Sequence, residues 1–413
     1  MGAGPKCVAI IGAGPAGSAL AAYLASAGCQ VAMFGLAKRP ELIIGESLVP
    51  AVIPILRELQ IEEEVRQYST LKPGASFLVE EGFEISISFD QRDRFQPGYA
   101  YNVPRDRFDE SLRTAAIAAG TRLFVHRARL APESTADCAT LSEDTLAATD
   151  GFLTKQPDLI VDASGRAQVL AKAFGIKSDA GPRHDVALFA HLDDAEVTHP
   201  GNVHIDRLTH GWSWRVPLPG RMSVGIVAAG EFVETQGSTA AEQFDRILTT
   251  EPNLCRYCQG SNRISRVMTY DNYQARNERL TGPGWALVGD AAGFVDPTFS
   301  SGLHIALSGA RRLADAIKRD RCLANYEKQT RGEIDTWGHI TDAFYDGRLF
   351  TLFRVGQEFS KSILGRLLDS HIEKHIARVI TGGGIAHPYS RRLLFFLLRH
   401  ALGGSDPNML RIR

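Results

Sequence analysis

The chain has 413 residues, of which 44% are hydrophobic and 23% charged, with 46 Lys and Arg against 47 Asp and Glu. This ordinary globular composition excludes a disordered or fibrous chain, and the length suffices for two or three domains. The net charge of −1 argues against nucleic-acid binding by bulk charge, and six cysteines are too few for a disulfide scaffold. We therefore expect a cytoplasmic protein that binds no nucleic acid.

The first predicted unit is a glycine turn between two strands. An apolar run at 8–11 precedes the turn GAGPAG at 12–17, which is followed by an Ala-rich segment at 18–27 and a second apolar run at 29–34. In such a unit Gly12 allows a tight bend, Gly14 lets the backbone approach a pyrophosphate and Gly17 lets the helix pack on the strand. The helix N-terminus then faces the phosphates. The unit predicts a dinucleotide site, with a purely structural turn as the alternative.

The end of the second predicted strand departs from the usual pattern. An acidic residue commonly binds the ribose hydroxyls there, but this chain has Gly35, followed by Lys38 and Arg39. A small residue followed by cations would suit the 2′-phosphate of NADP. The rest of the chain favours FAD, so we expect atypical adenosine contacts.

The uncharged run at 7–29 is long enough to cross a bilayer. Its glycines and its proline argue against both a transmembrane helix and a signal peptide. We expect no membrane association.

Two later segments repeat the pattern of a strand followed by a small-residue turn. The first is DLIVDASGR at 158–166, and the second runs from Trp285 through GDAAGFVDP to Gly302. Asp290, at a strand end, can accept hydrogen bonds from a ribityl chain, and the turn at 297–302 can present N–H groups to a flavin edge. Three such turns in this order fit one extended FAD; the alternative is two further turns of a doubly wound sheet.

The three turns together resemble FAD-dependent monooxygenases of the para-hydroxybenzoate hydroxylase type. Two further segments, GESLVP at 45–50 and WSWRVP at 212–217, resemble motifs of the flavin-dependent halogenases, and FSSG at 299–302 resembles their flavin loop. The resemblance implies an α/β fold, in which a Rossmann-like FAD-binding domain carries an antiparallel substrate-binding sheet and a helical C-terminal region.

The resemblance also implies a chemistry. In that family reduced FAD reacts with O2 to give a flavin C4a-hydroperoxide, halide attacks it, and a lysine captures the electrophilic halogen. Lys72 matches that lysine, although Pro73 departs from the family pattern, and Trp212 and Trp214 match the pair that keeps substrate away from the flavin. Glu46 is the fourth catalytic candidate, which would orient the lysine or a backbone group. The alternatives are a solvated loop lysine, two core aromatic residues and an acid at a helix N-terminus.

The expected cofactor contacts and the absence of metal complete the site. The residues expected to contact FAD are Gly12, Gly14, Pro15, Ala16, Gly17, Ser47, Arg105, Asp162, Gly289, Asp290, Pro297, Ser300, Ser301 and Gly302. Ser300 and Ser301 are also halide candidates, with simple capping of the next helix as the alternative. We expect no metal, because Cys255 and Cys258 form a lone CxxC and the histidines considered lack ligand spacing.

The spacing of the motifs predicts a discontinuous organisation. We expect residues 1–70, 100–175 and 265–330 to form the FAD-binding domain, 71–99 and 176–264 the substrate-binding sheet, and 331–413 a helical region. Residues 346–413 carry eleven Lys and Arg against five Asp and Glu, a net charge of +6 that leaves −7 for the remainder. This tail is either a solvated helical face or a docking surface for an acidic partner.

Three functions stay open at this point. The first is halogenation of a free or tethered pyrrole, phenol or indole. The second is hydroxylation of an aromatic residue, such as tryptophan, in a peptide or protein, and the third is a flavoprotein without oxygenase activity. No second dinucleotide fingerprint follows a strand, so we expect a separate flavin reductase to supply reduced FAD.

Overall fold

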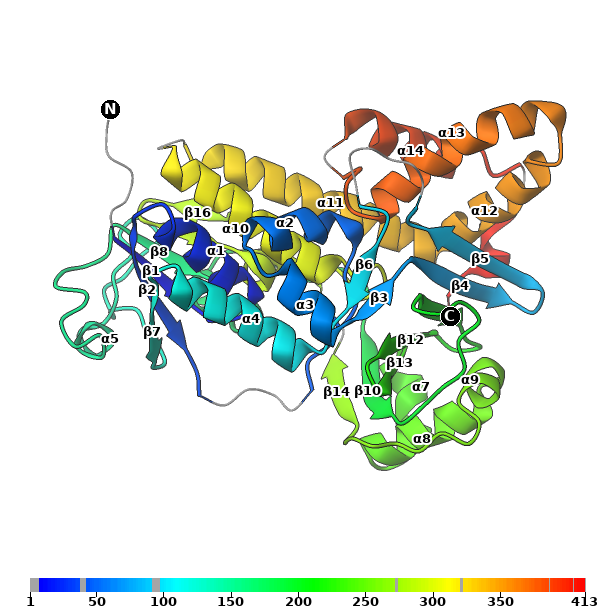
Figure 1. The fold of residues 1–413 in the computed structure, drawn as a ribbon, viewed down its shortest axis with the longest axis horizontal. Coiled ribbons are helices and arrows are strands. Elements are labelled where there is room, and N and C mark those ends of the chain that lie inside the picture. The colour runs from blue at the N-terminus through cyan, green and yellow to red at the C-terminus, as the bar shows by residue number, and fades with distance from the viewer. Residues whose placement is uncertain are drawn as a thin grey trace.

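Two sheets of different kinds form the frame of the molecule, as a computed structural model of the chain shows (Figure 1). The structure describes residues 7–37, 42–90, 97–271, 274–319, 322–385, 387–403 and 405–412. Lys38 and Arg39, the cations considered for a 2′-phosphate, lie outside these ranges.

The first sheet has six strands and is parallel except at one edge. In spatial order its strands are β16 (Thr281–Gly282), β17 (Trp285–Leu287), β8 (Leu159–Asp162), β1 (Cys7–Ile11), β2 (Gln30–Gly35) and β7 (Arg122–Val125). The central strands β1 and β8 are buried along their whole length, as their uninterrupted apolar sequences require. The predicted strands at 8–11 and 29–34 are thereby confirmed, each within one residue.

Three helices pack together against this sheet, and two of them, α1 (Pro15–Ala25) and α10 (Ser301–Lys318), start at a glycine turn. The third is α4 (Arg105–Ala118), and α1 packs against both of the others. Helix α1 begins three residues before the predicted segment, because Pro15 has the backbone angle of a first helical residue and needs no hydrogen-bond partner for its nitrogen.

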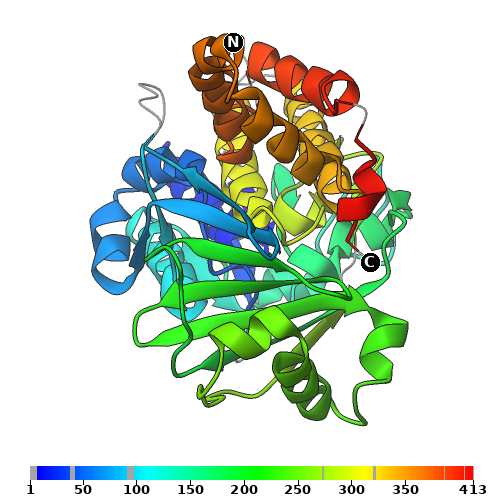
Figure 2. The same ribbon diagram turned by 90° about the vertical axis from the view of Figure 1, so that its right-hand side faces the viewer.

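The second sheet has seven strands and is antiparallel except for one pair. Its order is β14 (Met268–Asp271), β10 (Asp185–Leu192), β13 (Arg221–Ala229), β12 (Trp212–Leu218), β11 (Val203–Arg207), β4 (Gly74–Glu80) and β5 (Phe83–Ser88). The exception is β11 beside β4, which run parallel. Trp212, Trp214 and Val216 point into the large core shared with the first sheet, whereas Val224 and Ile226 on β13 point to the opposite face. That face is covered by α7 (Gly230–Glu234), α8 (Ala240–Thr250) and α9 (Pro252–Tyr257) (Figures 1 and 2).

The C-terminal part of the chain is helical and forms a cap at the top of Figures 1 and 2. It consists of α11 (Ala324–Tyr345), α12 (Arg348–Phe359), α13 (Ile363–Ile380) and α14 (Pro388–His400). The remaining short elements are α2 (Ile53–Glu58), α3 (Glu62–Tyr68), α5 (Glu143–Ala147), α6 (Val169–Ala173), β3 (Thr70–Lys72), β6 (Ala100–Asn102), β9 (Ser178–Asp179), β15 (Ala275–Asn277) and β18 (Gly293–Phe294). The expected α/β architecture, with a second, largely antiparallel sheet and a helical C-terminal region, is confirmed.

Candidate active site

A cavity of about 1170 Å³ lies at the carboxyl ends of the parallel strands. Its lining includes the residues that follow β1, β2, β8 and β17, and it continues to the inner face of the second sheet at Val203, Ile205 and Val216. Ligands of open α/β sheets bind at this edge, because the turns there expose free backbone N–H groups. The cavity therefore joins the expected cofactor turn to the expected substrate sheet.

The three glycines of the first turn occupy different environments. Gly12 has a φ of +119°, and a Cβ added to it would lie 2.2 Å from the Ala163 carbonyl oxygen. A Cβ on Gly17 would lie 2.0 Å from the Gly12 carbonyl oxygen, whereas a Cβ on Gly14 would meet no protein atom within 4 Å. Gly12, Gly14, Pro15 and Ala16 line the cavity. Packing thus explains Gly12 and Gly17, while the open space beside Gly14 is room for a ligand.

Residues 45–50, which we name the strap, cross between the two sheets. Glu46 and Ser47 both line the cavity and are both buried. The Ser47 hydroxyl donates to the Asn102 side-chain oxygen at 2.8 Å, and Glu46 Oε1 lies 2.9 Å from His191 Nε2 on β10. Glu46 therefore pairs with a histidine of the second sheet and not with Lys72.

Arg105 on α4 holds the residue that directly precedes the strap. Its guanidinium donates to the Ile44 carbonyl at 2.5 Å and to Asp109 at 3.0 Å, and it lines the cavity. The nearby Asp290 also lines the cavity. Desolvation raises the pKa of the Asp290 carboxyl to about 6, while Arg105 and Arg166 oppose that shift.

The other predicted cofactor residues divide into two groups. Pro297, Ser300 and Gly302 line the cavity, whereas Asp162, Gly289 and Ser301 lie outside its lining. The Asp162 carboxylate instead accepts the backbone N–H groups of Ser164 at 2.9 Å and Leu170 at 2.7 Å. Ser300 has a φ of 55° and makes no capping hydrogen bond with its side chain, so the capping alternative does not describe it.

Trp212 and Trp214 both line the cavity from β12, with ring centroids 5.8 Å apart. Trp212 Nε1 donates to the Tyr345 hydroxyl at 2.9 Å, and Trp214 Nε1 donates to the Ser223 hydroxyl at 3.3 Å. Both indoles are thus held by hydrogen bonds while their rings form part of the cavity wall.

Lys72 is buried and lies outside the cavity lining. The residue is 2% exposed, and its amine donates to the Leu48 carbonyl of the strap at 2.8 Å and lies 5.2 Å from the centre of the Phe89 ring. Burial lowers the pKa of the amine to about 7. The solvated-loop alternative is therefore wrong, because the short strands β3 and β6 enclose the side chain behind the strap.

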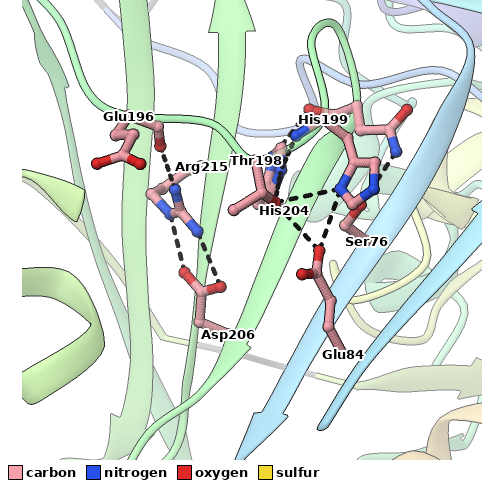
Figure 3. A network of polar contacts seen from close by, with 9 residues as sticks. Ser76, Glu84, Glu196, Thr198, His199, His204, Asp206 and Arg215 are labelled. Atoms are coloured by element: carbon pink, nitrogen blue, oxygen red, sulfur yellow. Dashed lines mark hydrogen bonds and ion pairs between the residues drawn. The ribbon is translucent and has the colours of Figure 1, made fainter. Parts of the chain in front are cut away.

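The face of the second sheet away from the cavity carries a separate polar network (Figure 3). Arg215, between Trp214 and Val216, pairs through Nε and Nη2 with both carboxylate oxygens of Asp206, at 2.9 and 3.0 Å, and both side chains are 1% exposed. Beside this pair, His204 contacts Thr198 at 3.1 Å. The pKa of His204 is lowered to about 3, mainly because the ring is buried and also because the positive charge of Arg215 is close. This network supports the tryptophan strand from behind.

Comparison with known proteins identifies the family. Residues 7–91 and 83–349 match the sequence profile of the tryptophan halogenases. The chain belongs to this family. It is 28% identical over 398 residues to the 1H-pyrrole-2-carbonyl-[peptidyl-carrier protein] chlorinase of Pseudomonas fluorescens, covering 86% of this chain and 87% of that protein. It is 30% identical over 379 residues to the tryptophan 2-halogenase of Chondromyces crocatus, which covers 87% of this chain and 72% of that protein.

Solved structures agree with this assignment. The myxobacterial chondrochloren halogenase superposes with a TM-score of 0.74 at 27% identity, covering 83% of this chain and 82% of that one. The flavin-dependent brominase Bmp2, at 21% identity and a TM-score of 0.79 over 96% and 98%, shares the fold. This halogenase is thus an oxidoreductase that uses FAD, O2 and halide on an aromatic substrate.

The residues of this halogenase fit FAD. The open space at Gly14 suits a pyrophosphate, the first turn of α1 supplies N–H groups, and Asp290 and the turn at 297–302 line the same cavity. Gly35 also lines it, so no acidic side chain stands at the usual ribose position. The segment from Val125 to Ser134, which includes Arg127 and Arg129, lines the cavity near that end and was not predicted.

Sequence reasoning also missed three polar partners, of which His191 and Asp296 are buried and Tyr345 is half-buried. His191 pairs with Glu46, Tyr345 receives the Trp212 hydrogen bond, and Asp296 accepts from Tyr345. Of the three, only Asp296 could have been suspected from its neighbours in sequence, because it directly precedes Pro297 of the predicted flavin turn. His371 and His375 have an i,i+4 spacing that was not singled out, but His375 contacts the Ser390 hydroxyl at 2.8 Å.

Two findings concern the described ranges alone. Within them, no three His, Cys, Asp or Glu side chains are grouped as metal ligands, and no helix is long and apolar enough to cross a bilayer.

Proposed function

We propose that this halogenase places chlorine or bromine on an electron-rich ring, with a pyrrole-2-carbonyl group held as a thioester on a carrier protein as its substrate. The observation that supports this is one cavity joining the glycine turn at Gly14 to the walls formed by Trp212 and Trp214. The similarity to the pyrrole carrier-protein chlorinase covers 86% of this chain. Its substrate is therefore the first to test.

The residues of the site divide the work. FAD held in the cavity, once reduced, would activate O2, and O2 is the oxidant that converts halide into an electrophile. We propose that the strap and the tryptophan pair separate the ring from the cofactor, and that residues 1–70, 100–175 and 265–330 form the cofactor-binding unit. Halogen then replaces one ring hydrogen, which leaves as a proton.

Lys72 is the proposed residue for halogen delivery. Because the pKa of its amine is about 7, both the neutral and the protonated form are present near neutral pH. The neutral amine is a nucleophile for electrophilic halogen, and the ammonium polarises hypohalous acid. Since Lys72 lies behind the strap and contacts Leu48, we propose that halogen reaches it past the strap backbone.

The test is mass spectrometry of a carrier protein loaded with pyrrole-2-carbonyl, after incubation with this halogenase, FAD, a separate flavin reductase, NADH, O2 and chloride or bromide. We expect a mass increase with the isotope pattern of chlorine or bromine. Addition of oxygen alone would favour the hydroxylating alternative, and an unchanged carrier would contradict the proposed substrate. Omitting the reductase tests the proposed partner, because rapid NADH oxidation by this chain alone would make it unnecessary.

A further inference from the structure

The outward face of α14 carries an alternating row of aromatic and cationic side chains. Tyr389, Arg392, Phe396 and Arg399 recur at spacings of three and four, so they share one side of the helix. Tyr389 is 50% exposed and Phe396 60% exposed, and both arginines are exposed. The opposite side packs inward through Ser390, Leu394 and Leu398. We name the four outward residues the α14 face.

The two arginines of the α14 face differ from the paired arginines inside the fold. Leaving aside residues 363–370, no carboxylate that the structure describes forms an ion pair with Arg392 or Arg399, whereas Arg215 and Arg312 are both paired within the fold. The surrounding tail at 346–413 has a net charge of +6, against −7 for the rest of the chain. The α14 face is therefore a positive patch in a positively charged tail, on a chain whose other residues carry a net negative charge, which favours an acidic partner at this face.

The α14 face also belongs to a unit that contacts the strap. The turn between α13 and α14 accepts a hydrogen bond through the Thr381 carbonyl from the Ala51 N–H at 3.3 Å. In the same turn, a Cβ on Gly382 would lie 3.3 Å from the side chain of Val49, which belongs to the strap, and 2.9 Å from Ala51 Cβ directly after it. Since the strap ends at residue 50 and lines the cavity through Glu46 and Ser47, α14 is anchored beside the active-site segment.

We propose that the α14 face docks the acidic carrier protein that presents the ring to the cavity. This inference rests on the proposed function. Arg392 and Arg399 would pair with carboxylates of the carrier, while Tyr389 and Phe396 would cover an apolar patch between them, and aromatic residues and arginine are the residues enriched at protein interfaces. A membrane surface fits less well, because the leucines at 394 and 398 face inward and only two aromatic rings are offered.

The experiment compares two forms of the same acyl group. Steady-state halogenation is measured with pyrrole-2-carbonyl on the carrier protein and on N-acetylcysteamine, a small thioester that needs no docking. We expect Arg392→Glu/Arg399→Glu to lower kcat/KM for the carrier form about tenfold or more through KM, and to reduce its salt dependence. Activity on the small thioester should not change. The matched control is Arg246→Glu/Lys328→Glu, which changes the net charge equally at exposed positions of α8 and α11.

The other outcomes distinguish failure of the docking proposal from failure of the proposed function. If the double variant and the control behave alike on the carrier form, the docking proposal is wrong while the proposed function stands. If the wild type halogenates the small thioester but not the carrier form, docking is again wrong. If it halogenates neither, the proposed function fails and the docking proposal fails with it. Co-sedimentation of the wild type, but not the double variant, with phosphatidylglycerol vesicles would assign the α14 face to membranes instead.

Discussion

Trp212 Nε1 donates a hydrogen bond of 2.9 Å to the hydroxyl of Tyr345, and that hydroxyl donates in turn to the Asp296 carboxylate at 3.1 Å. One phenol at the end of α11 therefore connects the tryptophan strand to the loop before Pro297. Arg183 lies over the Tyr345 ring at 4.5 Å, and Thr298 donates its backbone N–H to Asp296 at 2.9 Å. The tryptophan strand and the loop before Pro297 are consequently positioned by the same side chain.

We expect Tyr345→Phe to lower the amount of halogenated product formed per NADH consumed, which we call coupling. The Trp212 N–H would lose its acceptor in a buried site, which costs about 1–3 kcal/mol of unfolding free energy. Urea unfolding and tryptophan fluorescence measure the structural effect, and the ratio of halogenated product to NADH consumed measures coupling. The control is Tyr326→Phe, because Tyr326 is also buried but donates to the Leu287 backbone, away from the cavity. Equal coupling in both variants would show that Tyr345 is only structural.

A side chain added at Gly14 should weaken FAD binding, whereas one added at Gly17 should prevent folding. A valine at 14 enters open space, so Gly14→Val should fold normally but lose FAD affinity at least about tenfold, or about 1.4 kcal/mol. A valine at 17 would clash with the Gly12 carbonyl, so Gly17→Val should lose its folded near-ultraviolet circular dichroism. Flavin fluorescence titration measures the first effect. Wild-type FAD affinity in a folded Gly14→Val variant would place the pyrophosphate elsewhere.

Local patterns explain which features could be predicted from sequence. The strand at 8–11, the turn at 12–17 and the paired tryptophans are encoded by neighbouring residues, and the structure has the end of that strand, residues 12–16 of the turn and both tryptophans in the cavity lining. Contacts across long sequence separations left no such signal: His191 lies 145 residues from Glu46 and Tyr345 lies 133 from Trp212. Asp162 was misjudged for a different reason: it accepts two backbone N–H groups two and eight residues further along the chain, but its motif DASGR resembles a cofactor turn.

Lys72→Ala should abolish halogenated product if the amine delivers halogen. Lys72→Arg should fail as well, because a guanidinium stays protonated and is a poor nucleophile. Product is measured by mass spectrometry with FAD, reductase and bromide, and FAD affinity is measured separately to show that the cofactor still binds. Lys328→Ala, at an exposed position of α11, is the control. Full product from folded Lys72→Ala would make Lys72 a structural residue and would strengthen the hydroxylase alternative.

The same lysine predicts a pH dependence of stability. Its pKa is about 7 in the folded protein against an ordinary value of 10.5, so the unfolded chain binds a proton that the folded chain releases. Between pH 7 and 10.5 the wild type should therefore gain stability relative to Lys72→Met as pH rises, by up to about 1.4 kcal/mol per pH unit. Below pH 7 the difference should be constant. Urea unfolding of both proteins at pH 6, 7, 8 and 9 measures it, and a constant difference throughout would contradict burial of an ionisable amine.

Arg215→Met should destabilise the second sheet strongly, because it leaves Asp206 charged and buried without its partner. Removing one member of a buried ion pair commonly costs about 3–5 kcal/mol, and Arg215 also donates to the Glu196 carbonyl and stacks on Tyr257 at 4.1 Å. The double variant Arg215→Met/Asp206→Leu removes both charges and should recover most of that loss. Urea unfolding of the two single variants and the double variant gives the coupling energy. FAD affinity should stay unchanged in folded protein, since the pair lies on the face of the sheet opposite the cavity, whereas tryptophan fluorescence should shift because Trp214 adjoins Arg215. Additive losses in the double variant would show that the two charges do not stabilise each other.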